Sequence, residues 1–311
     1  MAAKESLFYD DGIMILEKPV NITSYQALAI IKKKIQPVRV GHTGTLDPFA
    51  SGILVLLFNQ ATRLADLFGN TTKTYEGILR LGQATDSGDL TGQIITEMSV
   101  PSLQEKEVKA AMKELTGLQM QIPPMFSAVK HEGIPLYRYA RKGIKINKPP
   151  RPINILNTEL NAWNGIDIAF TLTCASGVYV RSWGEDLAKK LGTAGHLQSL
   201  RRIANGPFTV GQSLSLAKAE ELEYKQLADM IVPCHEALAA LGLPRLRLNA
   251  AKSFQLRNGM ILPKAQFTDA PDDGPAYVVD ETGKMVSVVR FLRLDSHKSD
   301  KEYETIRVFN Y

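Results

Sequence analysis

Residues 41–52 read Gly-His-Thr-Gly-Thr-Leu-Asp-Pro-Phe-Ala-Ser-Gly, and the apolar run Ile-Leu-Val-Leu-Leu-Phe follows directly at 53–58. Three glycines and a proline within twelve residues indicate a loop, because glycine permits positive φ and proline interrupts regular pairing. Six continuous apolar residues are typical of a strand that is buried on both faces. The sequence therefore predicts a polar loop fixed to a central strand, an arrangement in which a rigid scaffold often presents chemical groups.

Asp47 is the carboxylate of this loop. An aspartate before a proline ordinarily forms a turn or a helix cap. The whole string from 41 to 54, however, resembles the catalytic motif of the TruB family, the bacterial tRNA pseudouridine-55 synthases, and further matches run through about the first 210 residues. The resemblance implies that Asp47 is the catalytic aspartate. It also implies that His42 helps to hold the target RNA arm once the target base has left its stack.

Two further segments resemble motifs of the same family. Residues 73–82 are similar to the second motif, which implies that Tyr75 stacks on the target base, a contact that contributes roughly 1–3 kcal/mol. A proton-relay role for the Tyr75 hydroxyl is a second interpretation. Residues 175–182 are similar to the third motif, whose arginine pairs with the catalytic aspartate, and here that residue is Arg181.

Physical reasoning also connects Asp47 with Arg181. Arg181 lies at a predicted strand-to-helix junction, where the helix dipole disfavours a cation, so a carboxylate partner is expected. The proposed family routes are attack on the ring, attack on the sugar and removal of a sugar proton, and all need an ionised aspartate. A pocket that excludes water raises the pKa of a carboxyl, and a guanidinium lowers it. At ~4 Å and an effective dielectric near 20, such a pair interacts by about 4 kcal/mol, enough to compete with burial.

Other candidate site residues come from shorter matches. Lys18 ends a stretch that resembles the family's opening motif, in which the lysine before proline helps to order the active-site region. Asp89 occupies the place of an acidic residue that can pair with the active-site arginine. Leu200 resembles an apolar residue that lines the uracil pocket, and it is equally well interpreted as a core residue. Arg201 and Arg202 are candidates for phosphate contacts.

Residues 123–150 interleave aromatic and basic side chains and carry two prolines at each end. Such interleaving is typical of surfaces that bind splayed RNA loops. The stretch resembles the RNA-gripping thumb of the family, which implies that Lys130 and Arg141 contact RNA. The alternative is a surface insertion whose charges are simply solvated.

The composition is that of an ordinary globular protein, with 44% hydrophobic and 22% charged residues in 311 positions. No run of eighteen apolar residues predicts a membrane span, and the start lacks the apolar segment of a signal peptide. The two cysteines, Cys174 and Cys234, have no metal-ligand spacing, so we expect reduced core thiols, a cytoplasmic location and no metal. A net charge of +5 is compatible with a polyanionic partner but is weak support for one.

The pattern of elements predicts an α/β protein of the α+β type. The resemblance implies a pseudouridine synthase fold over 1–243, with a mixed, largely antiparallel central sheet flanked by helices. The change to short strands near Pro244 predicts a second, mostly-β domain over 244–311, which resembles a PUA-type appendage. Local signals predict capping boxes at Thr23–Gln26 and Ser102–Glu105, and a hairpin turn at 164–165.

The function implied by the resemblance is isomerisation of a uridine in the T-arm loop of tRNA, at position 55, to pseudouridine. The reaction needs neither redox change nor hydrolysis, so no cofactor is expected. We expect a monomer that acts on tRNA without a partner protein or guide RNA. Two alternatives stay open: a non-catalytic RNA chaperone, a role that can also accompany the enzyme, and a guide-dependent synthase that acts on another RNA.

Overall fold

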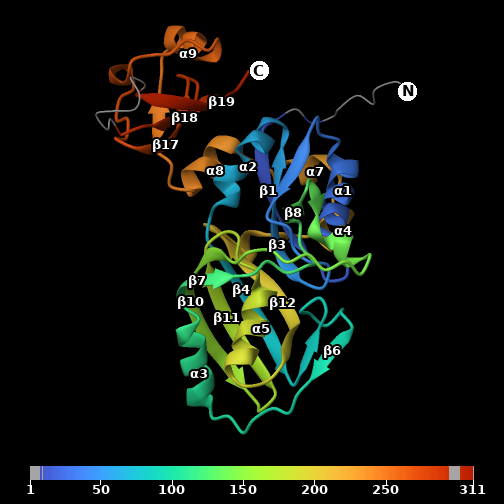
Figure 1. Cartoon of the computed structure of the whole chain (residues 1–311). Helices are drawn as coiled ribbons and strands as arrows, with labels where there is room; N and C mark the ends of the chain where they lie inside the picture. Colours follow the sequence, from blue (N-terminus) through green and yellow to red (C-terminus); the bar gives the residue numbers. More distant parts are fainter. Residues whose placement is uncertain (1–7, 9, 294–301, 311) are drawn as a thin grey trace.

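The computed structural model describes residues 8, 10–293 and 302–310 (Figure 1). The expectation about the start of the chain, residues 1–6, lies outside them. Within the described residues, eleven strands form one sheet. These are β1 (Gly12–Lys18), β2 (Val40–Thr43), β3 (Ser51–Phe58), β4 (Lys73–Leu81), β7 (Gly117–Gln121), β10 (Arg151–Trp163), β11 (Asp167–Cys174), β12 (Gly195–Asn205), β13 (Phe208–Thr209), β14 (Leu214–Ser215) and β15 (Val232–Pro233).

The sheet is mixed and largely antiparallel, as the family resemblance implied. Its main path runs β14-β1-β3-β12-β4-β11-β10-β7, and among the described strands of this sheet parallel pairing occurs only between β1 and β14 and between β3 and β12. The predicted central strand is confirmed, because every residue of β3 after Ser51 is buried. Gly52 has a φ of +106°, and a Cβ at this position would lie 2.2 Å from the carbonyl oxygen of Arg202. Only glycine therefore fits where β3 meets β12.

Helices pack against the sheet through three clusters of buried apolar residues. The α3 and α5 helices pack on β10, β11 and β12, while α1, α6 and α7 pack near β1 and β3 (Figure 1). The helices are α1 (Ser24–Ile35), α2 (Ala65–Gly69), α3 (Glu105–Glu114), α4 (Leu136–Ala140), α5 (Val180–Lys190), α6 (Leu216–Glu221), α7 (Tyr224–Ala228), α8 (Cys234–Ala240) and α9 (Ala250–Arg257), with 3-10 turns η1 (Asn59–Leu64), η2 (Val210–Gln212) and η3 (Lys264–Gln266).

The two predicted capping boxes have different outcomes. The box at the start of α1 is confirmed: the Thr23 hydroxyl accepts from the Gln26 amide, and the Gln26 side chain accepts from the Thr23 amide. The box at Ser102 is wrong by two residues, because Gln104 precedes the helix and its amide donates to Glu107 at 2.7 Å. Both registers place an acidic residue three positions on, so the local pattern could not separate them.

The predicted hairpin between β10 and β11 is confirmed, and Gly165 in its turn has a φ of +95°. One face of β11 is buried from Ile168 to Cys174, but Ile166 is 52% exposed because it belongs to the turn. Two short helices, α6 and α7, follow between 216 and 228.

A second sheet begins at Arg245 and has the order β16-β17-β18-β19. One face packs under α9, and the other joins an apolar cluster that contains Ile13, Val55 and Phe309. The small domain is therefore in apolar contact with the main one. Its strands are β16 (Arg245–Arg247), β17 (Gly274–Val279), β18 (Met285–Phe291) and β19 (Tyr303–Val308).

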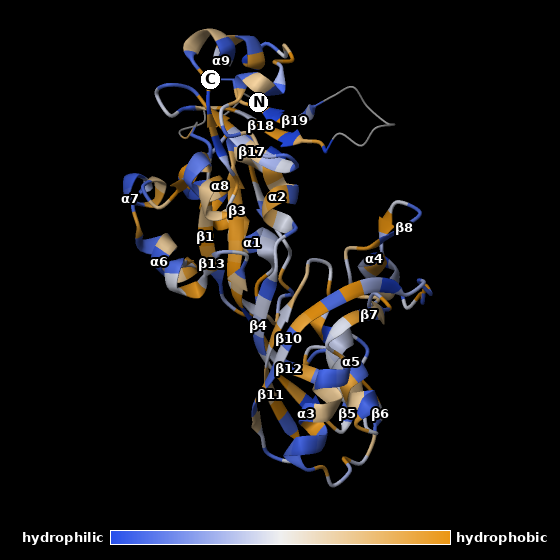
Figure 2. Ribbon diagram, turned by 90° about the vertical axis from the view of Figure 1, so that its left-hand side faces the viewer, coloured by the Kyte–Doolittle hydropathy of each residue, from blue (hydrophilic) through white to orange (hydrophobic). Residues whose placement is uncertain are grey.

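The expected insertion over 123–150 contains a two-residue ladder and the short helix α4, and it stands away from the main sheet in Figure 2. No helix among the described residues is long and apolar enough to cross a membrane. The remaining strands are β5 (Gln83–Thr85), β6 (Ile94–Glu97), β8 (Lys130–His131) and β9 (Ile134–Pro135).

Candidate active site

The loop that carries Asp47 is fixed by the start of α1. The hydroxyl of Ser24 donates to the carbonyl of Leu46 at 3.1 Å and accepts from its amide at 2.9 Å. The Asn21 amide donates to the carbonyl of Pro48 at 2.7 Å. The first part of the expected loop is instead the strand β2, so His42 belongs to the sheet. The loop proper is therefore short and tied on both sides of Asp47.

Arg181 meets Asp47 with two nitrogens. Its Nε lies 2.9 Å from Oδ2 of Asp47, and its Nη2 donates to Oδ1 at 3.2 Å. The arginine side chain is 4% exposed and the aspartate side chain 35% exposed. The expected contact between the two residues is therefore present, and the carboxylate keeps an open side toward solvent.

Arg181 also donates to two backbone carbonyls. Nη1 donates to the carbonyl of Ser87 at 2.7 Å, and Nη2 donates to the carbonyl of Phe126 at 2.8 Å. Asp89 is buried behind the guanidinium, with its Oδ2 3.9 Å from Nη1. These contacts hold the guanidinium plane and so define where the Asp47 carboxylate lies.

The electrostatics of Asp47 are a balance of opposing effects. Burial raises the pKa of its carboxyl, Arg181 lowers it, Asp89 raises it, and Lys18 lowers it. The pKa lies above its ordinary value because burial is the largest of these effects. Arg181 thus opposes the effect of burial without fully cancelling it.

A cavity of about 380 Å³ opens beside this ion pair. Tyr75 and Leu200 line it, and Leu200 also belongs to the hydrophobic core. Burial raises the pKa of the Tyr75 phenol, which therefore stays protonated at neutral pH. The cavity combines a carboxylate, a guanidinium, an aromatic ring and an apolar wall.

Lys18 is fully buried at the end of β1. Its ammonium donates to the carbonyls of Pro19 and Ile22 at 2.7 and 2.8 Å. Burial lowers the pKa of Lys18 to about 8, and the charge of Asp47 acts in the opposite direction. Lys18 therefore orders the chain before α1 and adds positive potential at the carboxylate.

Five of the nine candidate residues do not line this cavity: Lys18 and Asp89, described above, and His42, Lys130 and Arg141. His42 is half-buried, its Nδ1 has no hydrogen-bond partner among the described residues, and burial lowers the pKa of its ring. Lys130 is exposed on β8, and the guanidinium of Arg141 lies 5.4 Å from the ring centre of Tyr137. The insertion reaches the cavity instead through Phe126, Ser127 and Ala128.

The expectation that Arg202 contacts phosphate is wrong. Arg202 is 1% exposed, and it donates through Nε to the carbonyl of Ile53 at 2.8 Å and through Nη2 to that of Gly44 at 2.9 Å. It therefore links β3 to the loop that carries Asp47. Arg201, in contrast, is at the surface and pairs with Glu17 at 2.8 Å. Only the alternation of sides along β12 separates these neighbouring arginines.

Two cationic residues at the cavity were missed as site residues. Lys73 is buried, and burial lowers the pKa of its ammonium to about 8. Arg151 lies with its guanidinium carbon 5.1 Å from the ring centre of Tyr179 and donates to the carbonyl of Gly177. Arg151 directly follows the insertion in the sequence, and the pairing of β10 with β7 places it at the cavity.

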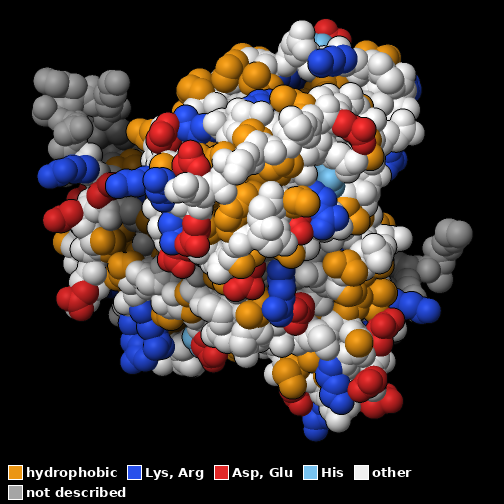
Figure 3. Space-filling model, turned by 90° about the horizontal axis from the view of Figure 1, so that it is seen from below, with side chains coloured by type: hydrophobic (Ala, Val, Ile, Leu, Met, Phe, Trp, Pro, Cys, Tyr) orange, Lys and Arg blue, Asp and Glu red, His pale blue; other side chains and the backbone are white. Residues whose placement is uncertain are grey.

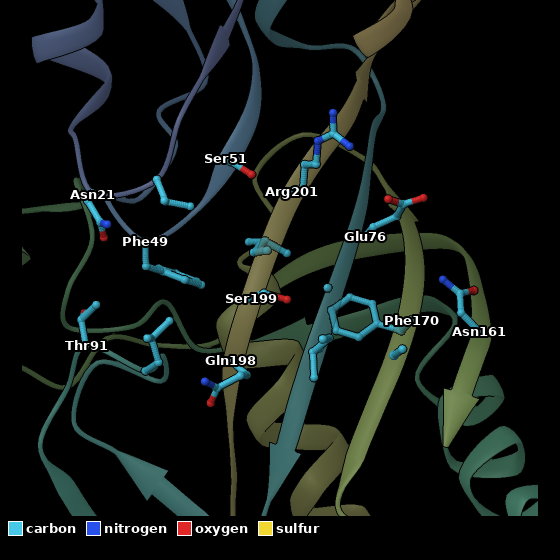
Figure 4. Close-up of a pocket in the computed structure, with 16 residues that line it drawn as sticks. Asn21, Phe49, Ser51, Glu76, Thr91, Asn161, Phe170, Gln198, Ser199 and Arg201 are labelled. Atoms are coloured by element: carbon cyan, nitrogen blue, oxygen red, sulfur yellow. The ribbon is translucent and has the colours of Figure 1, made fainter. Parts of the chain in front are cut away.

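A second cavity, of about 800 Å³, lies on the other side of β4 (Figure 4). Its wall includes Glu76, whereas Tyr75 lines the smaller cavity, because neighbouring residues of a strand point to opposite faces. Leu200 contributes to both cavities, but Asp47 and Arg181 line only the smaller one. The larger hollow lacks that ion pair.

Charge on the lower face does not identify an RNA surface. Figure 3 shows cationic and anionic side chains interspersed there, over the part of the sheet farthest from the small domain. Basic residues instead concentrate in the insertion and at the cavity rim, where they are Lys130, Arg138, Arg141, Lys142, Lys145, Lys148 and Arg151.

Family models match most of the main domain. Residues 32–180 match the model described as TruB family pseudouridylate synthase (N terminal domain), and residues 181–239 match the tRNA pseudouridylate synthase B C-terminal domain. The chain is 37% identical over 231 residues to the tRNA pseudouridine synthase B of Opitutus terrae, covering 74% of this chain and 96% of that relative. It is 35% identical over 281 residues to the protein of the same name from Neisseria meningitidis, covering 90% of each.

Solved structures share the fold. A Cbf5-Nop10-Gar1 complex contains a chain with a TM-score of 0.71 at 22% identity, covering 96% of this chain and 84% of that one. An H/ACA RNP bound to a substrate RNA containing 2′-deoxyuridine gives a TM-score of 0.68 at 20% identity, with 94% and 82% coverage. At this level of identity the likeness concerns the fold, which is the pseudouridine synthase fold expected from the sequence.

Proposed function

Because this chain belongs to the TruB family of pseudouridylate synthases, and so is an isomerase, we propose that it converts a uridine in the T-arm loop of tRNA, at position 55, to pseudouridine. The observation that carries the proposal is the two-pronged contact of Arg181 with Asp47 in the wall of a cavity of about 380 Å³. The relatives that support the substrate are named tRNA pseudouridine synthase B.

The reaction conserves every atom of the nucleotide. The bond between the sugar C1′ and uracil N1 breaks, the base turns, and C1′ bonds to C5 while a proton leaves C5 and N1 gains one. Asp47 acts as the ionised carboxylate, whether it attacks the ring, attacks C1′ or removes a sugar proton. The base first leaves its stack, at a cost of a few kcal/mol.

The neighbours of Asp47 have separate roles in this proposal. Arg181 opposes protonation of the carboxylate and directs its oxygens into the cavity. Tyr75 stacks on the base, and its protonated phenol is a hydrogen-bond donor rather than a base. Leu200 supplies an apolar wall. Lys18 orders the chain before α1, and Asp89 holds the guanidinium of Arg181 from the side away from Asp47.

RNA contacts outside the cavity are assigned to the insertion and the rim. Arg151 is fixed by Tyr179 and Gly177 at the edge of the cavity, where a phosphate next to the target nucleotide would pass. Lys130 and Arg141 on the insertion are placed farther out. His42 would contact the RNA arm from β2. Phosphate contacts of this kind position RNA without reading its sequence.

The proposal is tested with an isolated T-arm stem-loop RNA and the purified chain alone. Formation of pseudouridine at the target position, measured by mass spectrometry, is the expected result. The matched control is Asp47→Asn, which is expected to bind the RNA without converting it. A chain that binds but modifies nothing unless other proteins or a guide RNA are added would instead support a guide-dependent enzyme.

A further inference from the structure

Ser127 carries an unused hydroxyl in the wall of the cavity beside Asp47. The residue is 6% exposed, and its Oγ has no hydrogen-bond partner among the described residues. A buried hydroxyl without a partner is unfavourable, and folded proteins rarely retain one. The position therefore needs an explanation that the free protein does not supply.

The backbone around Ser127 is fixed at several points. The carbonyl of Phe126 accepts from Arg181 at 2.8 Å, and the carbonyl of Ser127 accepts from the amide of Tyr137 at 3.1 Å. Upstream, the hydroxyl of Ser182 donates to the carbonyl of Ile122 at 3.3 Å. The segment is thus attached both to α5, which carries Arg181, and to α4 within the insertion, while the hydroxyl remains unpaired. Rotation about χ1 redirects that hydroxyl without moving the backbone.

We propose that the Ser127 hydroxyl is a substrate-binding group, which hydrogen-bonds the uridine held against Asp47 and Arg181. This inference rests on the proposed function. A serine hydroxyl is one donor and two acceptors, and a uridine offers matching groups on the base edge and on the ribose. Ser127 follows Phe126, whose carbonyl accepts from Arg181, and both residues belong to the insertion. The contact would therefore join the insertion directly to the target nucleotide.

The test compares two buried hydroxyls in the full chain. Ser127→Ala and Thr193→Val each remove a hydroxyl that has no partner among the described residues, but Thr193 lines neither the Asp47 cavity nor the larger one. Both are placed in the Asp47→Asn background, which prevents turnover during binding. Dissociation constants are measured for T-arm stem-loops that carry uridine, 2′-deoxyuridine or an abasic residue at the target position.

Ser127→Ala is expected to weaken binding of the uridine RNA by roughly 3- to 10-fold, the effect of one lost neutral hydrogen bond. Binding of the abasic RNA, which keeps the ribose, is expected to weaken by a smaller factor if the bond is to the base and by the same factor if the bond is to the ribose hydroxyl. An unchanged dissociation constant for 2′-deoxyuridine RNA would assign the bond to the ribose hydroxyl, and equal weakening for both nucleotides would assign it to the base. Thr193→Val is expected to change none of the three.

Thermal unfolding separates this role from a structural one. An unpartnered hydroxyl contributes nothing favourable to folding, so the unfolding midpoint of Ser127→Ala should equal or exceed that of its parent. Uridine binding unchanged by Ser127→Ala, or weakened together with a lowered unfolding midpoint, would overturn the proposal. Turnover by the chain with Asp47 intact tests the function itself. Its failure would be seen as absence of pseudouridine, whatever the Ser127 result.

Discussion

Arg181 and Asp47 are 134 positions apart in the sequence, yet two nitrogens of the guanidinium contact both oxygens of the carboxylate. The loop of Asp47 is attached to α1 through Ser24, and Arg181 is held by the carbonyls of Ser87 and Phe126. Each partner is thus also fixed by contacts other than the ion pair. Such preorganisation is what an electrostatic active site needs.

Replacement of Arg181 by lysine should reduce pseudouridine formation by roughly 100-fold. Lysine keeps the charge but has a single nitrogen, so it cannot contact both oxygens of Asp47 and both backbone carbonyls. Two lost hydrogen bonds to charged groups, at about 1.5 kcal/mol each, give a factor of that size. Single-turnover kinetics on the stem-loop measure it.

A matched control for this substitution is Arg80→Lys. Arg80 makes a similar two-pronged contact with Asp167, at 2.9 and 3.0 Å, but its side chain is 42% exposed and away from the cavity. We expect turnover of that variant to equal that of the parent chain. Equal losses in both variants would mean that the Arg181 contact has no special part in the reaction.

The pH dependence should follow the ionisation of Asp47. In the proposed function the ionised carboxylate is the active form, so we expect turnover to rise as pH increases through its pKa. Because burial raises that pKa, we expect the rise above the pH that a free aspartate would give. Asp89 adds to this upward shift. Asp89→Asn should therefore move the acid limb of the pH–rate profile to lower pH. A limb that stays in place would assign it to another group.

Arg202 should matter for folding as well as for activity. It links Ile53 in β3 to Gly44 at the start of the Asp47 loop through two charged hydrogen bonds. Arg202→Met should lower the free energy of unfolding by about 3 kcal/mol, at about 1.5 kcal/mol for each bond, measured in urea. The surface neighbour Arg201→Met is the control, and we expect it to lower stability by less than 1 kcal/mol because exposed ion pairs contribute little.

We expect Arg151 to contribute to the salt dependence of RNA binding. If it neutralises one phosphate, Arg151→Ala should reduce the slope of log K against log salt by roughly 0.7. Lys109→Ala, which removes an exposed charge on α3, changes the net charge equally and should leave the slope unchanged. Identical slopes for both variants and the parent chain would exclude the phosphate contact.

Local sequence patterns predicted much of the fold. The apolar run of β3 and the Thr23 cap each act over a few residues, and the structure contains both. The predicted loop at 41–52 is present only between β2 and β3, because its first residues pair in β2 and its last two begin β3. The contact of Asp47 with Arg181 was also expected, from the motifs and from the need of a buried carboxylate for a cation. The position of Gln104 at the start of α3 was not expected, because Glu105 and Glu107 each fit a capping box with a different first residue.

The missed features depend on pairing between distant strands. Arg202 and Arg201 look alike in the sequence, and only the register of β12 against β3 buries one and exposes the other. Arg151 reaches the cavity because β10 pairs with β7, which no local pattern encodes. The free hydroxyl of Ser127 likewise follows from tertiary contacts alone.

The central claim is that the Asp47 carboxylate carries out the chemistry, and the Asp47→Asn variant tests it most directly. The measurement is tritium release from a T-arm stem-loop labelled at uridine C5, together with the dissociation constant for the same RNA. We predict a dissociation constant within about threefold of the parent chain, because a factor of three is less than one hydrogen bond, and no tritium release above background. Release at the rate of the parent chain would contradict the account.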